Sequence, residues 1–213
     1  MLPKPYNSYW SPYNMIKSEK FKYFSDIYKE TTPIVLITVL AELVVGLELL
    51  RVQALFGLLP GLLIILPDLL ENRGNIASNL AQRLGTSVYL GIIGWDLGIN
   101  DELKVDFLST LFLSGILSIT LSTLAFLYVV LFGIPHISIF GFLFITLIMS
   151  LGIETILTII TVLVVLLSHK LGLDPDNVTI PIIATVGDIL TVGSLYFVLN
   201  FMLLIDKSIS IFK

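Results

Sequence analysis

The sequence has no cysteine and only two histidines, His136 and His169. Without cysteine, disulfide bonds and cysteine-based metal or redox sites are excluded. Two histidines so far apart do not suggest a zinc site, and no serine, histidine and acid stand in an arrangement typical of nucleophilic catalysis. The usual signatures of covalent and zinc-dependent enzymes are therefore missing.

Charged residues are scarce as well. They make up 13% of the 213 residues, whereas 56% are hydrophobic and the mean hydropathy is +0.97. This composition lies outside the range of water-soluble domains and predicts an all-α integral membrane protein surrounded by membrane lipids. The net charge of −4 gives no support for nucleic acid or another anionic partner.

Long charge-free runs mark the expected spans. With about 20 residues needed to cross the hydrocarbon core, we expect five transmembrane helices, at 32–52, 54–83, 107–134, 138–168 and 177–206. The third and fourth are joined by the short turn "GIPHIS", in which Pro135 is the breaker.

The second segment is predicted to be a broken helix. Pro60, Pro67, a group of charges and Gly74 interrupt it. Non-helical backbone at membrane depth is tolerated only where it faces protein or a water-filled cavity. The break therefore indicates a permeation path.

The first 31 residues are rich in lysine and aromatic residues. Phe21, Phe24 and Tyr28 fall on one helical face, which predicts a short interfacial helix before the first span. The distribution of basic residues favours a cytoplasmic N-terminus and an outside C-terminus in the cell membrane. With this orientation the inside set is Lys4, Lys17, Lys20, Lys22, Lys29, Arg73, Arg83, Lys104 and Lys170, and the outside set is Arg51, Lys207 and Lys213.

Three acids lie inside the predicted spans: Glu42, Glu154 and Asp188. Such residues cost roughly 2.5–3.5 kcal/mol each on insertion scales and commonly mark a function. The structural alternative is a carboxyl that is kept protonated or is paired with a neighbouring helix, for which Arg73 and Arg83 are the available partners.

Asp188 has polar surroundings that set it apart. Ala184, Asp188 and Thr191 stand at helical spacing, with Pro181 and Thr185 on the same face, and the proline frees a carbonyl one turn earlier. Carboxylates, hydroxyls and carbonyls without sulfur or imidazole are the ligands of a hard cation. Mg²⁺ fits best, because it keeps much of its water and needs only one or two carboxylates. Chemistry alone leaves Ca²⁺, Mn²⁺, Co²⁺, Na⁺ and H⁺ open.

Two motifs carry a family resemblance. "PDLLENRGNIASNLAQRLGTS", residues 67–87, resembles the Pro-x6-Gly-Asn signature in the second helix of the MgtE and animal solute-carrier magnesium transporters. "DPDNVTIPIIATVGD", residues 174–188, is similar to the family's Asp-Pro-Asp-Asn motif that leads into the fifth helix and ends in Gly-Asp. The two motifs stand in the family's order and cover both ends of the predicted bundle.

The resemblance implies a pore aspartate at Asp188 that binds the cation, assisted by the backbone carbonyl of Ala184. It also implies that Gly74 and Asn75 shape the broken second helix beside the site. Thr185 and Asp68 complete our set of candidate metal-site residues. One five-helix unit supplies half of a pathway in this family, so a homodimer is expected.

The sequence also departs from the family pattern. Arg73 stands where MgtE has a second glycine, and Asp68 and Glu71 add charges, which puts the family's ion selectivity in question here. The large cytoplasmic sensor region of MgtE is not expected, since about 30 residues precede the first span. We divide the chain into an N-terminal segment at 1–31, a cation-transport domain at 32–206 and a short tail at 207–213.

Three alternatives to a magnesium pore are an ion-coupled exchanger, an intramembrane protease and a non-transporting subunit. A channel driven by voltage and an exchanger coupled to Na⁺ or H⁺ fit the sequence equally. An intramembrane aspartyl protease is disfavoured because "TVGD" lacks the first glycine of its motif and no second aspartate completes a dyad. A non-transporting membrane subunit is suggested by the small residues Ser114, Gly115, Ser118 and Ser122, which are explained more simply as a helix-packing face.

Overall fold

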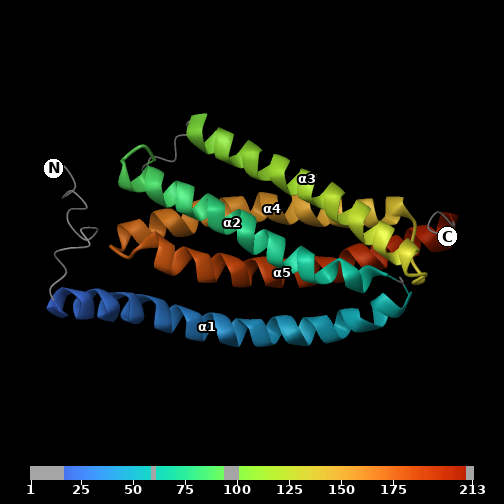
Figure 1. Ribbon diagram of the computed structural model, residues 1–213, viewed down its shortest axis with the longest axis horizontal. Coiled ribbons are helices and arrows are strands. Elements are labelled where there is room, and N and C mark those ends of the chain that lie inside the picture. Colours follow the sequence, from blue (N-terminus) through green and yellow to red (C-terminus); the bar gives the residue numbers. More distant parts are fainter. Residues whose placement is uncertain (1–16, 59–60, 94–100, 210–213) are drawn as a thin grey trace.

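The computed structural model describes residues 17–58, 61–93 and 101–209. Within them the chain forms five α-helices that lie side by side (Figure 1), which confirms the all-α class. The helices are α1 (Lys17–Leu58), α2 (Leu66–Tyr89), α3 (Asp101–Leu131), α4 (Ile139–Lys170) and α5 (Pro175–Ile209), with a short 3-10 turn, η1 (Leu62–Ile64), before α2.

Four of the described helices, α1, α3, α4 and α5, are long and apolar enough to cross a membrane. The fifth, α2, has 24 residues and is about 36 Å long, which also exceeds the hydrocarbon thickness. It lacks the apolar composition because it carries Asp68, Glu71, Arg73 and Arg83. Because α2 packs against α5, α4 and, less extensively, α3, it buries Arg73, whereas Glu71 and Arg83 remain exposed.

The expected separate interfacial helix is not observed. Residues 17–31 are helical, but α1 continues without interruption through Pro33 into the first span. Phe24 and Tyr28 do share one face, since their rings stack with centroids 6.3 Å apart, and both side chains are exposed. The side chain of Phe21 lies outside the described residues.

The predicted break of the second segment is found near its start, at Gly61, and not at Gly74. We expected that segment to begin at residue 54, but α1 extends to Leu58. The bend follows at Gly61, whose positive φ of 84° suits glycine, and α2 then starts with Pro67 in its first turn. Gly74 lies inside an uninterrupted α2, so the bend precedes this helix and does not divide it.

The small residues of α3 form a packing face, as expected. Ser114, Ser118 and Ser122 are all buried against α4, and the hydroxyls of Ser122 and Thr146 share a hydrogen bond between the two helices. Gly115 also lies near α4, because a side chain added there would meet Leu151. These residues serve helix association.

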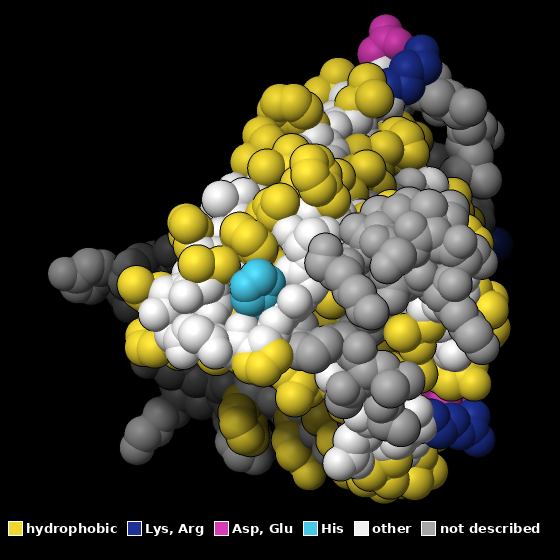
Figure 2. All heavy atoms as spheres, turned by 90° about the vertical axis from the view of Figure 1, so that its right-hand side faces the viewer, with side chains coloured by type: hydrophobic (Ala, Val, Ile, Leu, Met, Phe, Trp, Pro, Cys, Tyr) yellow, Lys and Arg dark blue, Asp and Glu magenta, His cyan; other side chains and the backbone are white. Residues whose placement is uncertain are grey.

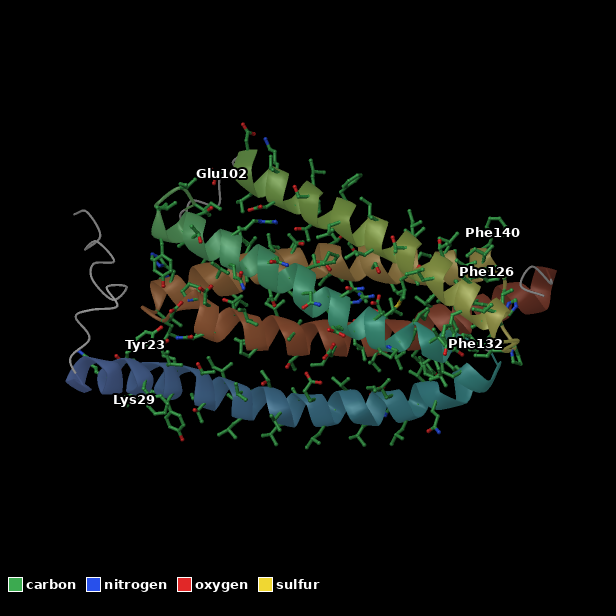
Figure 3. All side chains as sticks on the ribbon, viewed as in Figure 1. Tyr23, Lys29, Glu102, Phe126, Phe132 and Phe140 are labelled. Atoms are coloured by element: carbon green, nitrogen blue, oxygen red, sulfur yellow. The ribbon has the colours of Figure 1, made fainter. Side chains whose placement is uncertain are left out.

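Aromatic side chains gather at both ends of the bundle. Figure 3 shows Phe126, Phe132 and Phe140 around the turn between α3 and α4, with Tyr23 and Lys29 at the opposite end. Seen from the α3–α4 end, the surface is mainly hydrophobic, with charged side chains near its margin (Figure 2). Both histidines join such aromatic contacts: His136 packs edge-on against Phe126, and His169 against Tyr89.

Candidate cation site

An open groove between α2 and α5 brings four of the predicted site residues together. Asp188 and Ala184 line it from α5, and Gly74 and Asn75 line it from α2. The remaining lining residues are Pro67, Leu70, Glu71 and Ser78. The two motifs therefore meet at one place in the fold, although 86 residues lie between them in the sequence.

The antiparallel packing of α2 and α5 produces this meeting. At one end, a side chain on Gly85 would lie 3.6 Å from the Asp176 carboxylate. Further along, Gly74 and Asn75 lie across from Ala184 and Asp188. A side chain added at Gly74 would meet nothing within 4 Å, so the absence of a side chain there leaves open space in the groove.

The groove is large enough for a hydrated cation. Its volume is about 440 Å³, and six waters occupy roughly 180 Å³ of liquid volume. The Asp188 carboxylate is half-buried, and Asn75 and Glu71 are exposed within the groove. Oxygen ligands around a space of this size suit a hard cation that keeps most of its water.

The other two predicted site residues lie elsewhere. Thr185 is buried and does not line the groove. Asp68 is hydrogen-bonded to Asn72 and lines a small cavity on another side of α2, between this helix, α3 and α4. That cavity is about 10 Å³, room for a single water.

Four ionisable residues from four helices lie at one level of the bundle. They form what we call the charged layer: Glu42 of α1, Arg73 of α2, Glu154 of α4 and Asp188 of α5. Asp188 is within electrostatic range of both Glu42 and Arg73, and Arg73 is within range of Glu154 and Asp188. The layer therefore contains three acids and one base.

The contacts between helices fix this common level. A hydrogen bond of 3.1 Å from Asn177 to Glu30 aligns the start of α5 with α1. On the other side, Arg73 donates to the carbonyl of Met149 and so ties α2 to α4. The α4 and α5 helices are aligned by Leu157, which would lie 3.3 Å from a side chain on Gly187.

Arg73 and Glu154 are the most deeply buried members of the layer. Arg73 donates from Nε to the carbonyl of Leu69 at 2.8 Å and from Nη1 to that of Met149 at 2.9 Å. Glu154 has no exposed surface, and neither of its carboxylate oxygens has a hydrogen-bond partner among the described residues. The sequence singled out Glu154, but it did not show that Arg73 interacts electrostatically with both this acid and Asp188.

A single chain does not enclose this groove. No group of three or more histidine, aspartate or glutamate side chains in the described ranges is arranged to hold a metal ion. Asp188 instead faces an open groove on the side of the bundle. Waters or a second surface must supply the remaining ligands of any cation bound there.

Comparison with known proteins gives one match. A family model described as MgtE, divalent cation transporter, matches residues 66–198. The matched region starts with α2 and ends within α5, so it contains every residue that lines the groove. No curated protein and no solved structure gives a significant match to the chain.

Proposed function

The chain belongs to the MgtE family of divalent cation transporters, and we propose that it moves Mg²⁺ across the cell membrane through a pore formed by two copies of the chain. The family is one of transporters rather than enzymes, which argues against the protease alternative. The observation that carries the proposal is the open groove in which Asp188, Ala184, Gly74 and Asn75 meet.

In this proposal Asp188 supplies the charge that attracts the cation. The Ala184 carbonyl and the Asn75 amide contact the water shell of the ion, and Gly74 leaves room for it. We assign no direct contact to Thr185 or Asp68, because Thr185 is buried and Asp68 lines the other cavity. Mn²⁺, Co²⁺ and Ca²⁺ are competing ions to be compared in the same assay.

The exposure of the groove supports a homodimer. In a single chain the half-buried Asp188 would face the surroundings of the bundle, where an uncompensated carboxylate is costly. A second copy related by a two-fold axis would cover the groove and add a second Asp188, and two carboxylates balance one Mg²⁺. Mass measurement in nanodiscs that found monomers alone would contradict this assembly.

Asp188→Asn tests the proposal, because it preserves size and polarity but removes the charge. We expect a folded dimer with Mg²⁺ binding and proteoliposome flux largely lost. Asn75→Ala should reduce flux less, because an amide contributes only a dipole. The control is Glu48→Gln on α1, which removes a carboxylate paired with Arg51 outside the groove. Wild-type Mg²⁺ flux in Asp188→Asn would overturn the proposal.

A coupled exchanger is a second candidate function, favoured by the unpartnered Glu154 in the charged layer. Flux measurements under imposed gradients distinguish the two modes. A channel responds to voltage alone, whereas an exchanger responds to an imposed Na⁺ or pH gradient at zero voltage.

A further inference from the structure

Glu154 is a buried acid without a structural partner. It has no exposed surface, and both carboxylate oxygens lack hydrogen-bond partners among the described residues. An ionised carboxylate in such a place is strongly unfavourable unless another charge compensates it. Thr158, one turn further along α4, is also buried with an unpartnered hydroxyl.

The charged groups around Glu154 are few. Over residues 107–131, α3 has no charged residue, and over residues 177–204, α5 has only Asp188. From α2, Arg73 lies within electrostatic range of Glu154, while Asp68 lines the small cavity. Arg73 is consequently the cation that can compensate an ionised Glu154, and it faces Asp188 as well.

Arg73 is held in place between the two acids. Its two hydrogen bonds to the carbonyls of Leu69 and Met149 fix the guanidinium within the bundle. One fixed positive charge compensates one carboxylate, and two acids share it. If a bound cation compensates Asp188, Arg73 is left to compensate Glu154. The occupancy of the groove at Asp188 therefore sets whether Glu154 is ionised or neutral.

We propose that Glu154 is a proton-binding site that releases its proton when a divalent cation binds at Asp188, with Arg73 carrying the electrostatic coupling. This inference rests on the proposed function of Asp188. Without a bound cation, Arg73 balances Asp188, and Glu154 stays neutral with its proton. With a cation at Asp188, the charge of Arg73 is left to balance Glu154; the carboxyl O–H bond breaks and the proton leaves to water.

The small cavity offers a route for this proton. Ser150, one turn before Glu154 on α4, lines it together with Arg73 and Asp68. Ser114 and Ser118 of α3 add two hydroxyls to the same cavity. Glu154 does not line this cavity, which has room for one water, so in the proposed route the proton crosses the one turn of α4 between Glu154 and Ser150 and leaves past the partly exposed carboxylate of Asp68.

Proton release on Mg²⁺ addition tests the inference directly. The purified protein in nanodiscs is placed in weak buffer with a pH indicator, and Mg²⁺ is added at neutral pH. We expect release of up to about one proton per chain from the wild type. Glu154→Gln should bind Mg²⁺ but release less than about half as many protons, and Glu154→Asp should restore the release. Glu48→Gln, an acid outside the charged layer, should release as many as the wild type.

The outcomes separate this inference from the proposed function. Asp188→Asn should abolish Mg²⁺ binding, whereas Glu154→Gln should preserve binding and reduce only the proton release. Wild-type release from Glu154→Gln would overturn the inference and leave the role of Asp188 standing; so would a folded Glu154→Gln protein that no longer binds Mg²⁺. If the Glu154 variants do not fold, infrared difference spectra of the wild type decide: Mg²⁺ must remove the carbonyl band of a protonated carboxyl, and an unchanged band contradicts the inference.

Discussion

The first two helices of the chain have opposite surroundings. α1 is apolar along most of its length and packs mainly onto α5, so only Val45 and Val52 among its described side chains are fully buried. α2 carries four charged residues, yet it packs against α3, α4 and α5 and buries one of them, Arg73. Hydropathy therefore reports which helix faces lipid, whereas position within the bundle decides which helix can carry charge.

The family match divides the molecule at the same boundary. It begins at residue 66, the first residue of α2, and leaves α1 outside. α1 nevertheless contributes Glu42 to the charged layer.

Replacing an arginine should give the largest difference in stability between a variant in α2 and its matched variant in α1. Arg73→Leu removes the one base of the charged layer, leaves Glu154 and Asp188 without compensation, and should destabilise the protein by about 3–5 kcal/mol. Arg51→Leu, on an exposed part of α1, should change stability by less than about 0.5 kcal/mol. Thermal unfolding in detergent measures both. Similar unfolding temperatures for the two variants would show that the burial of Arg73 is not required for the fold.

Glycine replacement should separate stability from transport. Gly74→Ala and Gly46→Ala both place a methyl group where no atom lies within 4 Å, so each should stabilise its helix by about 1 kcal/mol. The Gly74 methyl enters the groove and should lower Mg²⁺ flux severalfold, while Gly46→Ala on α1 should leave flux unchanged. Equal flux from the two variants would remove Gly74 from the pathway.

The smallest change in stability is expected for a substitution where α1 contacts the start of α5. Glu30→Ala removes the acceptor of the Asn177 hydrogen bond and should lower stability by about 1 kcal/mol or less, because apolar packing provides most of the contact between these helices. Asp26→Ala, an exposed acid one turn earlier, is the control. A large fall in unfolding temperature for Glu30→Ala alone would mean that this hydrogen bond, rather than packing, attaches α1.

The sequence predicted the later helices well and the first two less well. The charge-free run from Phe107 and the Pro135 turn placed α4 within two residues of its observed bounds and α3 within six. The boundary between α1 and α2 was wrong because residues 53–58 contain no proline, and the single Gly57 does not stop the helix before Leu58. Pro33 removes one backbone donor, which by itself did not end α1.

The candidate site was likewise predicted only in part from the sequence. Helical spacing placed Ala184 and Asp188 on one face, and the groove contains both. The charged layer was not predictable, because it depends on how far α1, α2 and α4 are shifted along α5, and side-chain contacts such as that of Arg73 with Met149 set those shifts. For the same reason Asp68 and Asp188, on two helices that pack together, belong to different cavities.

The packing of α2 among later helices affects how the protein is inserted into the membrane during synthesis. α2 is synthesised before α3, α4 and α5, the helices among which it buries Arg73. During that interval it is too polar to remain in lipid by itself, since each charged residue at the bilayer centre opposes insertion. α2 must therefore wait at the membrane surface or within the insertion machinery, and it takes its final place only when the C-terminal half of the chain has arrived.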